Sequence, residues 1–160
     1  MKSTTRQLAV VALVGAFVLM WRAQTDQDVA TAQGRKAIMV TRIYTGPDGL
    51  SHAEESELKL SASGAAGVSD MIKATGVQFR RTPAGTFSDW HVGPRRQYVI
   101  TLSGRGEIEV AGGKKISLEP GSIELIEDTT GKGHTTRAVG KDDRVSIAIP
   151  LADQSVGSGR

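Results

Sequence analysis

The chain of 160 residues contains no cysteine, few aromatic residues and only a small excess of charge. Without cysteine, the protein has no disulfide, no thiolate metal site and no cysteine nucleophile. The formal net charge of +3 is scattered along the chain, so the sequence does not indicate a nucleic-acid partner. Hydrophobic residues make up 39% and charged residues 23%, which are globular values. We therefore expect one folded domain.

Long apolar runs are also missing, apart from Leu8 to Trp21 near the N-terminus. As a helix this run would extend about 21 Å, which is short of the roughly 30 Å hydrocarbon core of a bilayer. A short basic stretch precedes it, and Ala30-Thr31-Ala32 offers small residues for cleavage after Ala32. Residues 1–32 are thus predicted to be an export signal or an uncleaved membrane anchor, and the protein exported or membrane-anchored. A true start at Met39 is the alternative and would leave the protein cytoplasmic.

Glycine, by contrast, is abundant, and most of the 19 glycines separate short apolar or alternating runs. Such runs recur about every ten residues without a helical period, which predicts an all-β sandwich or barrel over residues 39–151. Residues 33–38 are then a linker and 152–160 a flexible tail. We expect a loop at Ser63–Ser69. The predicted strands are Met39–Tyr44 (at a sheet edge), Leu58–Ser61, Gly76–Arg80, Tyr98–Leu102, Glu107–Val110, Lys115–Leu118, Ile123–Ile126 and Arg144–Leu151.

Residues 85–104 hold one of the three histidines in a regular spacing of glycines and polar residues. Gly85 is followed after five residues by His91, then by Gly93 after one, Gln97 after three and Gly104 after six. This spacing matches the first cupin motif, G-x5-H-x-H-x3,4-E-x6-G. Gly93 stands in place of the second histidine and Gln97 in place of the glutamate.

A second polar stretch, EDTTGKGH at residues 127–134, is similar to the second cupin motif, G-x5-P-x-G-x2-H-x3-N. Gly131 and His134 supply the G-x2-H part, whereas Thr129 replaces the proline and Ala138 the asparagine. The chain therefore resembles the cupin superfamily, and within it the small single-domain cupins. The resemblance implies an all-β, cupin-type jelly-roll β-barrel with its site at the two motifs. It also implies a homodimer.

In metal-binding cupins the two motifs supply three histidines and a glutamate to one divalent ion, so the resemblance implies His91, Gln97 and His134 as metal ligands. Zinc, iron, manganese and nickel all remain open. A glutamine amide lacks the negative charge that offsets dehydration of a divalent ion, so such a site needs a further carboxylate. A metal-free pocket, in which both histidines only form hydrogen bonds, is the alternative. The carboxylates nearby in sequence are Asp89, Glu107, Glu109 and Asp128.

Arg95 is a further candidate, because period-two alternation from His91 would place it with Gln97 on one face of a regular strand. An inward Arg95 would bind a carboxylate or phosphate of a ligand through its planar donor fork. Its alternative is an ion pair with Asp128 or Glu127. Trp90, next to His91, would wall the pocket or belong to the core.

Two functions remain open. The first is an enzyme on a small polar organic molecule, of isomerase, lyase or oxygenase type, with His91, His134 and Arg95 as catalytic residues. It would be metal-assisted or would use histidine acid–base chemistry, with the turn of residues 127–134 aiming His134 into the barrel. The second is a non-catalytic module that binds or senses a small ligand without metal. His52 is expected to be a surface residue, and a membrane is expected as a partner only through an uncleaved N-terminus.

Overall fold

The computed structural model describes residues 36–152. The predicted signal or anchor at residues 1–32 and nearly all of the predicted tail lie outside the described residues. Between residues 36 and 152 no helix is long and apolar enough to cross a membrane. The one helical element in that range is a short 3-10 turn, η1 (Ala111–Gly113).

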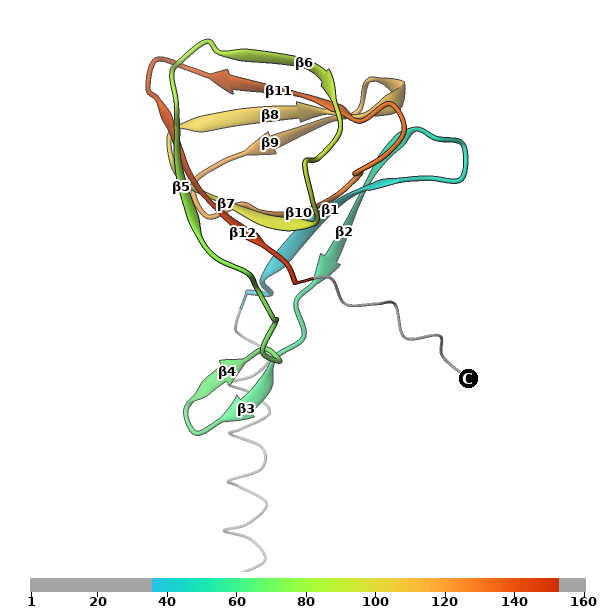
Figure 1. Cartoon of the computed structure of the whole chain (residues 1–160). Helices are drawn as coiled ribbons and strands as arrows, with labels where there is room; N and C mark the ends of the chain where they lie inside the picture. The colour runs from blue at the N-terminus through green and yellow to red at the C-terminus, as the bar shows by residue number, and fades with distance from the viewer. Residues whose placement is uncertain (1–35, 153–160) are drawn as a thin grey trace, which may run out of the picture. The chain divides into compact units, whose positions relative to one another are not determined.

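The described residues form two facing β-sheets and a small separate hairpin (Figure 1). The six-stranded sheet has the order β2-β1-β10-β7-β12-β5 and the four-stranded sheet the order β6-β11-β8-β9. The strands of the larger sheet are β1 (Met39–Thr45), β2 (Ser51–Glu57), β5 (Gln78–Thr82), β7 (Gln97–Ser103), β10 (Ile123–Glu127) and β12 (Arg144–Pro150). Those of the smaller sheet are β6 (Phe87–His91), β8 (Arg105–Glu109), β9 (Lys115–Leu118) and β11 (His134–Val139), and the hairpin consists of β3 (Ser61–Ser63) and β4 (Ala66–Val68).

The pairing of strands β5 to β12 is nested. Strand β5 pairs with β12, β6 with β11, β7 with β10 and β8 with β9, each pair antiparallel. The chain from β5 to β12 is therefore one long antiparallel ribbon, rolled up so that its strands divide between two sheets. This arrangement is a jelly roll. Strands β1 and β2 extend the larger sheet beyond β10, with β1 parallel to β10.

Alternation along the strands decides which side chains enter the barrel. In β12 the inward, buried positions are Arg144, Ser146 and Ala148, and in β7 they are Gln97, Val99 and Thr101. Four of these six inward positions are polar. Because buried polar groups are costly unless they are hydrogen-bonded, such an interior indicates a binding cavity as well as a core.

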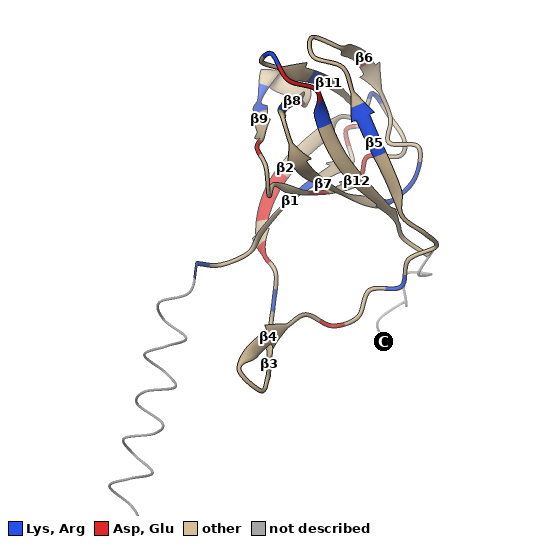
Figure 2. Cartoon of the chain, turned by 90° about the vertical axis from the view of Figure 1, so that its left-hand side faces the viewer, with Lys and Arg blue, Asp and Glu red and all other residues tan. Residues whose placement is uncertain are grey.

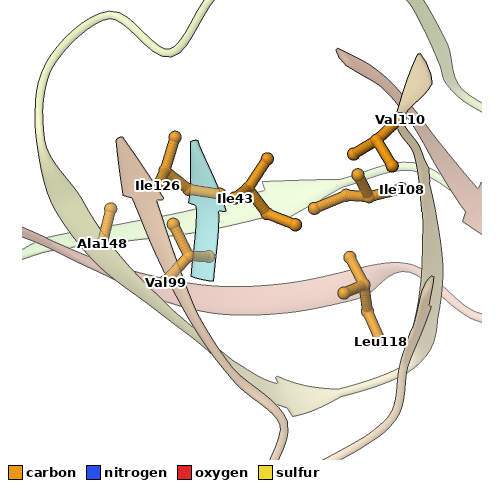
Figure 3. Close-up of a cluster of buried hydrophobic side chains, with 7 residues drawn as sticks. All are labelled: Ile43, Val99, Ile108, Val110, Leu118, Ile126 and Ala148. Atoms are coloured by element: carbon orange, nitrogen blue, oxygen red, sulfur yellow. The ribbon is translucent and has the colours of Figure 1, made fainter. Parts of the chain in front are cut away.

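The apolar core lies between the sheets (Figure 3), and three of its residues, Val99, Ile108 and Ile126, also line the cavity described below. It combines one residue from each of six strands with Val110, so no single element provides it. Ile43 and Ala148 have no exposed surface. Its members are Ile43, Val99, Ile108, Val110, Leu118, Ile126 and Ala148.

The two edges of the six-stranded sheet carry opposite charge (Figure 2). Edge strand β2 exposes Glu54, Glu55 and Glu57, and edge strand β5 carries Arg80 and Arg81. Charged side chains on edge strands disfavour pairing with another chain.

Most of the predicted strands are present, and several predictions need correction. Met39–Tyr44 is a strand but not an edge, because β2 covers it. Strand β2 was not expected, because its sequence is polar and acidic. The strand predicted at Leu58–Ser61 begins only at Ser61, as β3. The predicted loop Ser63–Ser69 is largely the β3–β4 hairpin. Strand β11 was also missed, because its HTTRAV sequence lacks a continuous apolar face.

Candidate functional site

A cavity of about 190 Å³ lies between the two sheets of the barrel. It is smaller than the roughly 300–1,000 Å³ of pockets for drug-sized ligands, so it suits a small molecule. Five hydroxyl side chains line it, together with a set of nitrogen-bearing and acidic side chains. That set consists of Arg80, His91, Gln97, Glu124, His134 and Arg144.

His134, at the start of β11, is fixed by a buried carboxylate. Its Nδ1 lies 2.6 Å from Asp128 Oδ2, and Ser51 Oγ donates to the same oxygen at 2.8 Å. Asp128 has no exposed surface and His134 is 4% exposed. A carboxylate that accepts from Nδ1–H selects the tautomer in which Nε2 carries the lone pair. The pair therefore presents a basic nitrogen, and the hydrogen-bonded turn expected to aim His134 into the barrel is present.

His91 lies directly opposite, because β6 contains an irregularity. His91 pairs with His134, but Ser88 pairs with Thr136, so three steps along β6 match two along β11. In a regular strand, alternation from Ser88 would direct Trp90 inward. Because of this β-bulge, His91 faces inward in place of Trp90. The two imidazole rings have their centroids 4.7 Å apart. His91 Nδ1 lies 2.6 Å from the backbone oxygen of Asp89, so this ring too is held through Nδ1.

Gly133 permits this close approach of the two strands. Its φ is 73°, in the left-handed region that favours glycine. A Cβ at this position would collide with the backbone carbonyl of His91. The glycine of GKGH thus allows His134 to face His91.

Gln97, the first residue of β7, lies in the cavity and is 3% exposed. Arg80 Nη2 is 3.5 Å from its Oε1, and Arg80 Nε donates to Gln78 Oε1 at 3.0 Å. Burial, and then the nearby Arg95 guanidinium, lowers the pKa of Arg80. The amide of Gln97 therefore faces a cation of the protein itself.

Glu124 and Arg144 form the most buried charged pair of the cavity, with side-chain exposures of 2% and 9%. Arg144 is held by Thr101 Oγ1, which accepts from its Nε at 3.1 Å and from its Nη2 at 2.8 Å. Glu124 Oε2 lies 3.5 Å from Arg144 Nη2 and has no hydrogen-bond partner within the described part of the chain. Burial raises the pKa of Glu124 to about 7, although the charge of Arg144 acts in the opposite direction.

Arg95 does not enter the cavity. Strand β6 ends at His91 and β7 begins at Gln97, so Arg95 lies in the connection between them, where it is exposed. The ion pair with Glu127 is made by its neighbour Arg96, whose Nε donates to Glu127 Oε1 at 2.9 Å. The alternation that placed Arg95 inward fails because Gly93 and Pro94 interrupt the strand.

The other sequence candidates lie outside the cavity lining. Trp90 is half-buried, with Lys132 Nζ 3.9 Å from its ring centroid. Glu107 pairs with Lys115, and Asp89 is exposed. His52 bonds to Asp48 at the surface, with 41% of its side chain exposed.

The described residues do not fit the divalent metal that the cupin resemblance implies. Across residues 36–152, no group of three or more histidine, cysteine, aspartate or glutamate side chains could hold a metal ion. Asp128 binds His134 and Ser51 through Oδ2, and its Oδ1 is buried without a hydrogen-bond partner among the described residues. At the position of the missing histidine, a Cβ on Gly93 would lie 2.5 Å from Ile126 Cγ2. Two neutral imidazoles and one amide therefore have no anionic ligand to join them.

The chain was compared with protein families, curated proteins and solved structures. No protein-family model and no curated protein matches the chain. Among solved structures, a cupin protein from Bacteroides fragilis is 22% identical, with 64% of this chain and 89% of that chain covered and a TM-score of 0.39. An RmlC-like cupin from Desulfovibrio desulfuricans is 20% identical, with coverages of 50% and 80% and a TM-score of 0.37. The Cnp3 cupin domain of Schizosaccharomyces pombe is 12% identical, with coverages of 76% and 88% and a TM-score of 0.40.

At these TM-scores, 0.40 and below, the solved structures bear on neither ligand nor reaction. The fold follows from the nested pairing of β5 to β12 within the chain itself. The chain has a jelly-roll fold.

Three polar residues of this cupin-type cavity were not found from the sequence: Arg80, Glu124 and Arg144. Each lies in a predicted strand, and a charged residue in a strand is usually solvent-exposed. The alternation of side chains along a strand could have identified Glu124 and Arg144 as inward residues. In β10 and β12 they share the face of Ile126 and Ala148, which are apolar and buried.

Proposed function

We propose that the cavity binds a small polar organic molecule and that His134, together with His91, transfers a proton on it, as in an isomerase or a lyase. The observation that carries this proposal is the buried Asp128–His134 pair, 2.6 Å between Oδ2 and Nδ1, with His91 opposite. A histidine oriented by a carboxylate is a common general base.

In this proposal His134 Nε2 accepts a proton from the ligand. The imidazolium that forms is stabilised by the Asp128 carboxylate, which Ser51 holds in place. Because Asp128 and His134 are both buried, their attraction is weakly screened by solvent.

His91 differs from His134 in being exposed, and its Nδ1 is bonded to a backbone oxygen in place of a carboxylate. Because it is exposed, His91 can exchange protons with solvent. We assign it the return of a proton to the ligand and exchange with solvent. Adjacent donor and acceptor imidazoles are what a proton shift within one small molecule requires.

The experiment follows exchange of carbon-bound hydrogen in deuterium oxide. Short-chain 2-oxo and 2-hydroxy acids are incubated with the purified protein, and loss of their C–H signals is measured by proton NMR. We expect exchange with the wild type and a decrease of about 100-fold or more in His134→Gln, the scale of general acid–base catalysis. His52→Gln is the matched control, because His52 lies outside the cavity. Equal exchange rates in wild type and His134→Gln contradict the proposal.

A non-catalytic binding module is the second candidate. It is favoured by the cavity's two arginines, which recognise an anion without any chemistry. Under this alternative, ligands bind to the wild type and to His134→Gln alike, and no exchange occurs with either protein.

Export and dimerisation remain proposals from the sequence. Mass spectrometry of the mature N-terminus tests cleavage after Ala32, and a start at Met39 would contradict export. Light scattering of the purified protein tests the homodimer, which a monomer at high concentration would contradict.

A further inference from the structure

The cavity contains a second polar cluster, formed by Arg80, Glu124 and Arg144 and distinct from the histidine pair. Its members come from strands β5, β10 and β12, which lie apart in the sequence but in one sheet. Burial, and then the charge of Arg80, lowers the pKa of Arg144, while Glu124 raises it. The two guanidinium groups are thus close enough to repel each other.

This cluster lacks partners for several of its polar groups. Within residues 36–152, Arg80 forms no salt bridge, and its hydrogen-bond acceptors are two neutral glutamine oxygens. Glu124 Oε2 is fully buried and without a hydrogen-bond partner there. A buried polar atom without a partner costs about 1–3 kcal/mol, so a purely structural cluster would be expected to satisfy it. An unpartnered oxygen beside two cations in a cavity indicates a ligand-binding subsite.

The charges in this cluster determine which ligand it suits. Two guanidinium groups face one carboxyl group, so the cluster has an excess of positive charge and attracts an anion. A carboxylate accepts two parallel hydrogen bonds from arginine. An ammonium group would be repelled by both arginines, whereas a hydroxyl is neutral.

A hydroxyl also suits Glu124 in either protonation state, because it can donate to a carboxylate or accept from a carboxylic acid. Glu124 Oε2 lies 3.5 Å from Arg144 Nη2. Groups bound to these two atoms are therefore close together in the ligand, and a hydroxyl on the carbon next to the carboxylate suits this spacing.

We propose that Arg80, Arg144 and Glu124 form a subsite for the 2-hydroxycarboxylate group of a small organic acid. The arginines bind the carboxylate, and Glu124 Oε2 pairs with the hydroxyl. This inference rests on the proposed function in one respect, since the ligand occupies the same cavity. Arg80 donates a hydrogen bond to Gln97, and Gln97 pairs in register with Ile126. Ile126 of β10 lies between Glu124 and Asp128 in the chain, so the subsite lies beside the histidine pair.

The test measures binding without turnover, by calorimetry or ligand-observed NMR, with four matched probes. Lactate has both groups, propionate lacks the hydroxyl, lactamide lacks the carboxylate and alanine has an ammonium in place of the hydroxyl. We expect lactate to bind best. Loss of one charge-assisted or buried hydrogen bond corresponds to about tenfold weaker binding or more, so each of the other probes should be weaker by at least that factor.

Variants separate this subsite from the histidine pair. Arg80→Gln should weaken lactate binding by about tenfold or more, while Arg81→Gln, the adjacent outward residue of β5, should leave it unchanged. Failure of proton transfer and failure of binding are distinguished in the wild type, because lactate binding without hydrogen exchange contradicts only the proposed function.

Three results would overturn the inference: no binding of lactate or its short-chain 2-hydroxy homologues, equal binding of lactate and propionate, or equal loss in Arg80→Gln and Arg81→Gln. Because the ligand series is measured on the wild type, the inference is testable even if a variant does not fold.

Discussion

The two clusters that line the cavity satisfy their polar groups in different ways. At the histidine end, Asp128 Oδ2 accepts from both His134 and Ser51, at 2.6 and 2.8 Å, and among the described residues only Oδ1 of this carboxylate has no hydrogen-bond partner. At the arginine end, Glu124 approaches Arg144 at 3.5 Å and its Oε2 forms no hydrogen bond among the described residues. Both carboxylates are almost completely buried. Glu124 is an inward residue of β10, and Asp128, directly after the end of β10, follows the same alternation.

The difference shows how one strand supports two kinds of site. A carboxylate with good donors orients a base before any ligand arrives, which is the preorganisation that acid–base chemistry requires. A carboxylate without donors keeps an interaction free for a ligand. The first cluster should therefore stabilise the fold, and the second should weaken it in a pH-dependent way.

The largest effect is expected from removing the carboxylate at the histidine end. Asp128→Ala leaves the Ser51 hydroxyl and His134 Nδ1 buried without their acceptor. We expect the free energy of unfolding to fall by roughly 3–5 kcal/mol, measured by urea denaturation. Asp89→Ala is the control, because His91 bonds to the backbone oxygen of Asp89 and not to its side chain. Equal stability losses in both variants would refute the proposed difference between the two carboxylates.

At the arginine end, Glu124→Gln should change how stability depends on pH. Because its pKa is raised, Glu124 keeps its proton in the folded protein up to about pH 7, whereas an ordinary glutamate releases it near pH 4.5. The folded state therefore binds more protons in this interval, and its free energy of unfolding decreases as the pH rises from about 4.5 to about 7.

The decrease should be on the order of 3 kcal/mol in the wild type and absent in Glu124→Gln. Denaturation of both proteins at the two ends of the interval measures it. Glu119→Gln serves as the control, since Glu119 is exposed. A variant whose pH dependence equals that of the wild type would show that Glu124 titrates as an ordinary surface carboxyl.

The smallest effect is expected at Gly93, near the histidine pair, where Ile126 leaves no space for a side chain. A Cβ there would lie 2.5 Å from Ile126 Cγ2, and Ile126 is 4% exposed. Gly93→Ala should lower the free energy of unfolding by about 1–3 kcal/mol through overpacking. Gly76→Ala, where no atom lies within 4 Å of the added Cβ, should stay within about 0.5 kcal/mol of the wild type. If Gly93→Ala is as stable as Gly76→Ala, a lack of space does not explain the missing third imidazole.

The all-β prediction is confirmed, because strand period and turn glycines are local signals in the sequence, and the observed strand pairing is also that of the jelly roll that the cupin resemblance implied. The boundaries of β9 agree with the prediction, and those of β7, β10 and β12 differ by one residue at one or both ends. Strands β2, β6 and β11 were missed because their sequences are largely polar, and polar strands carry no apolar period. The catalytic and metal-binding roles assigned to His91, Gln97 and His134 stay predictions.

By itself, the sequence determined which segments are strands and that His91, Gln97 and His134 occupy matching motif positions. Only the tertiary structure decided which side chains meet. The bulge in β6 turns His91 toward His134, and the break before β7 leaves Arg95 outside. Arg80, Glu124 and Arg144 come together because nested pairing brings β5, β10 and β12 into one sheet. Contacts between residues so far apart in the chain depend on register and bulges, which local patterns of residues do not encode.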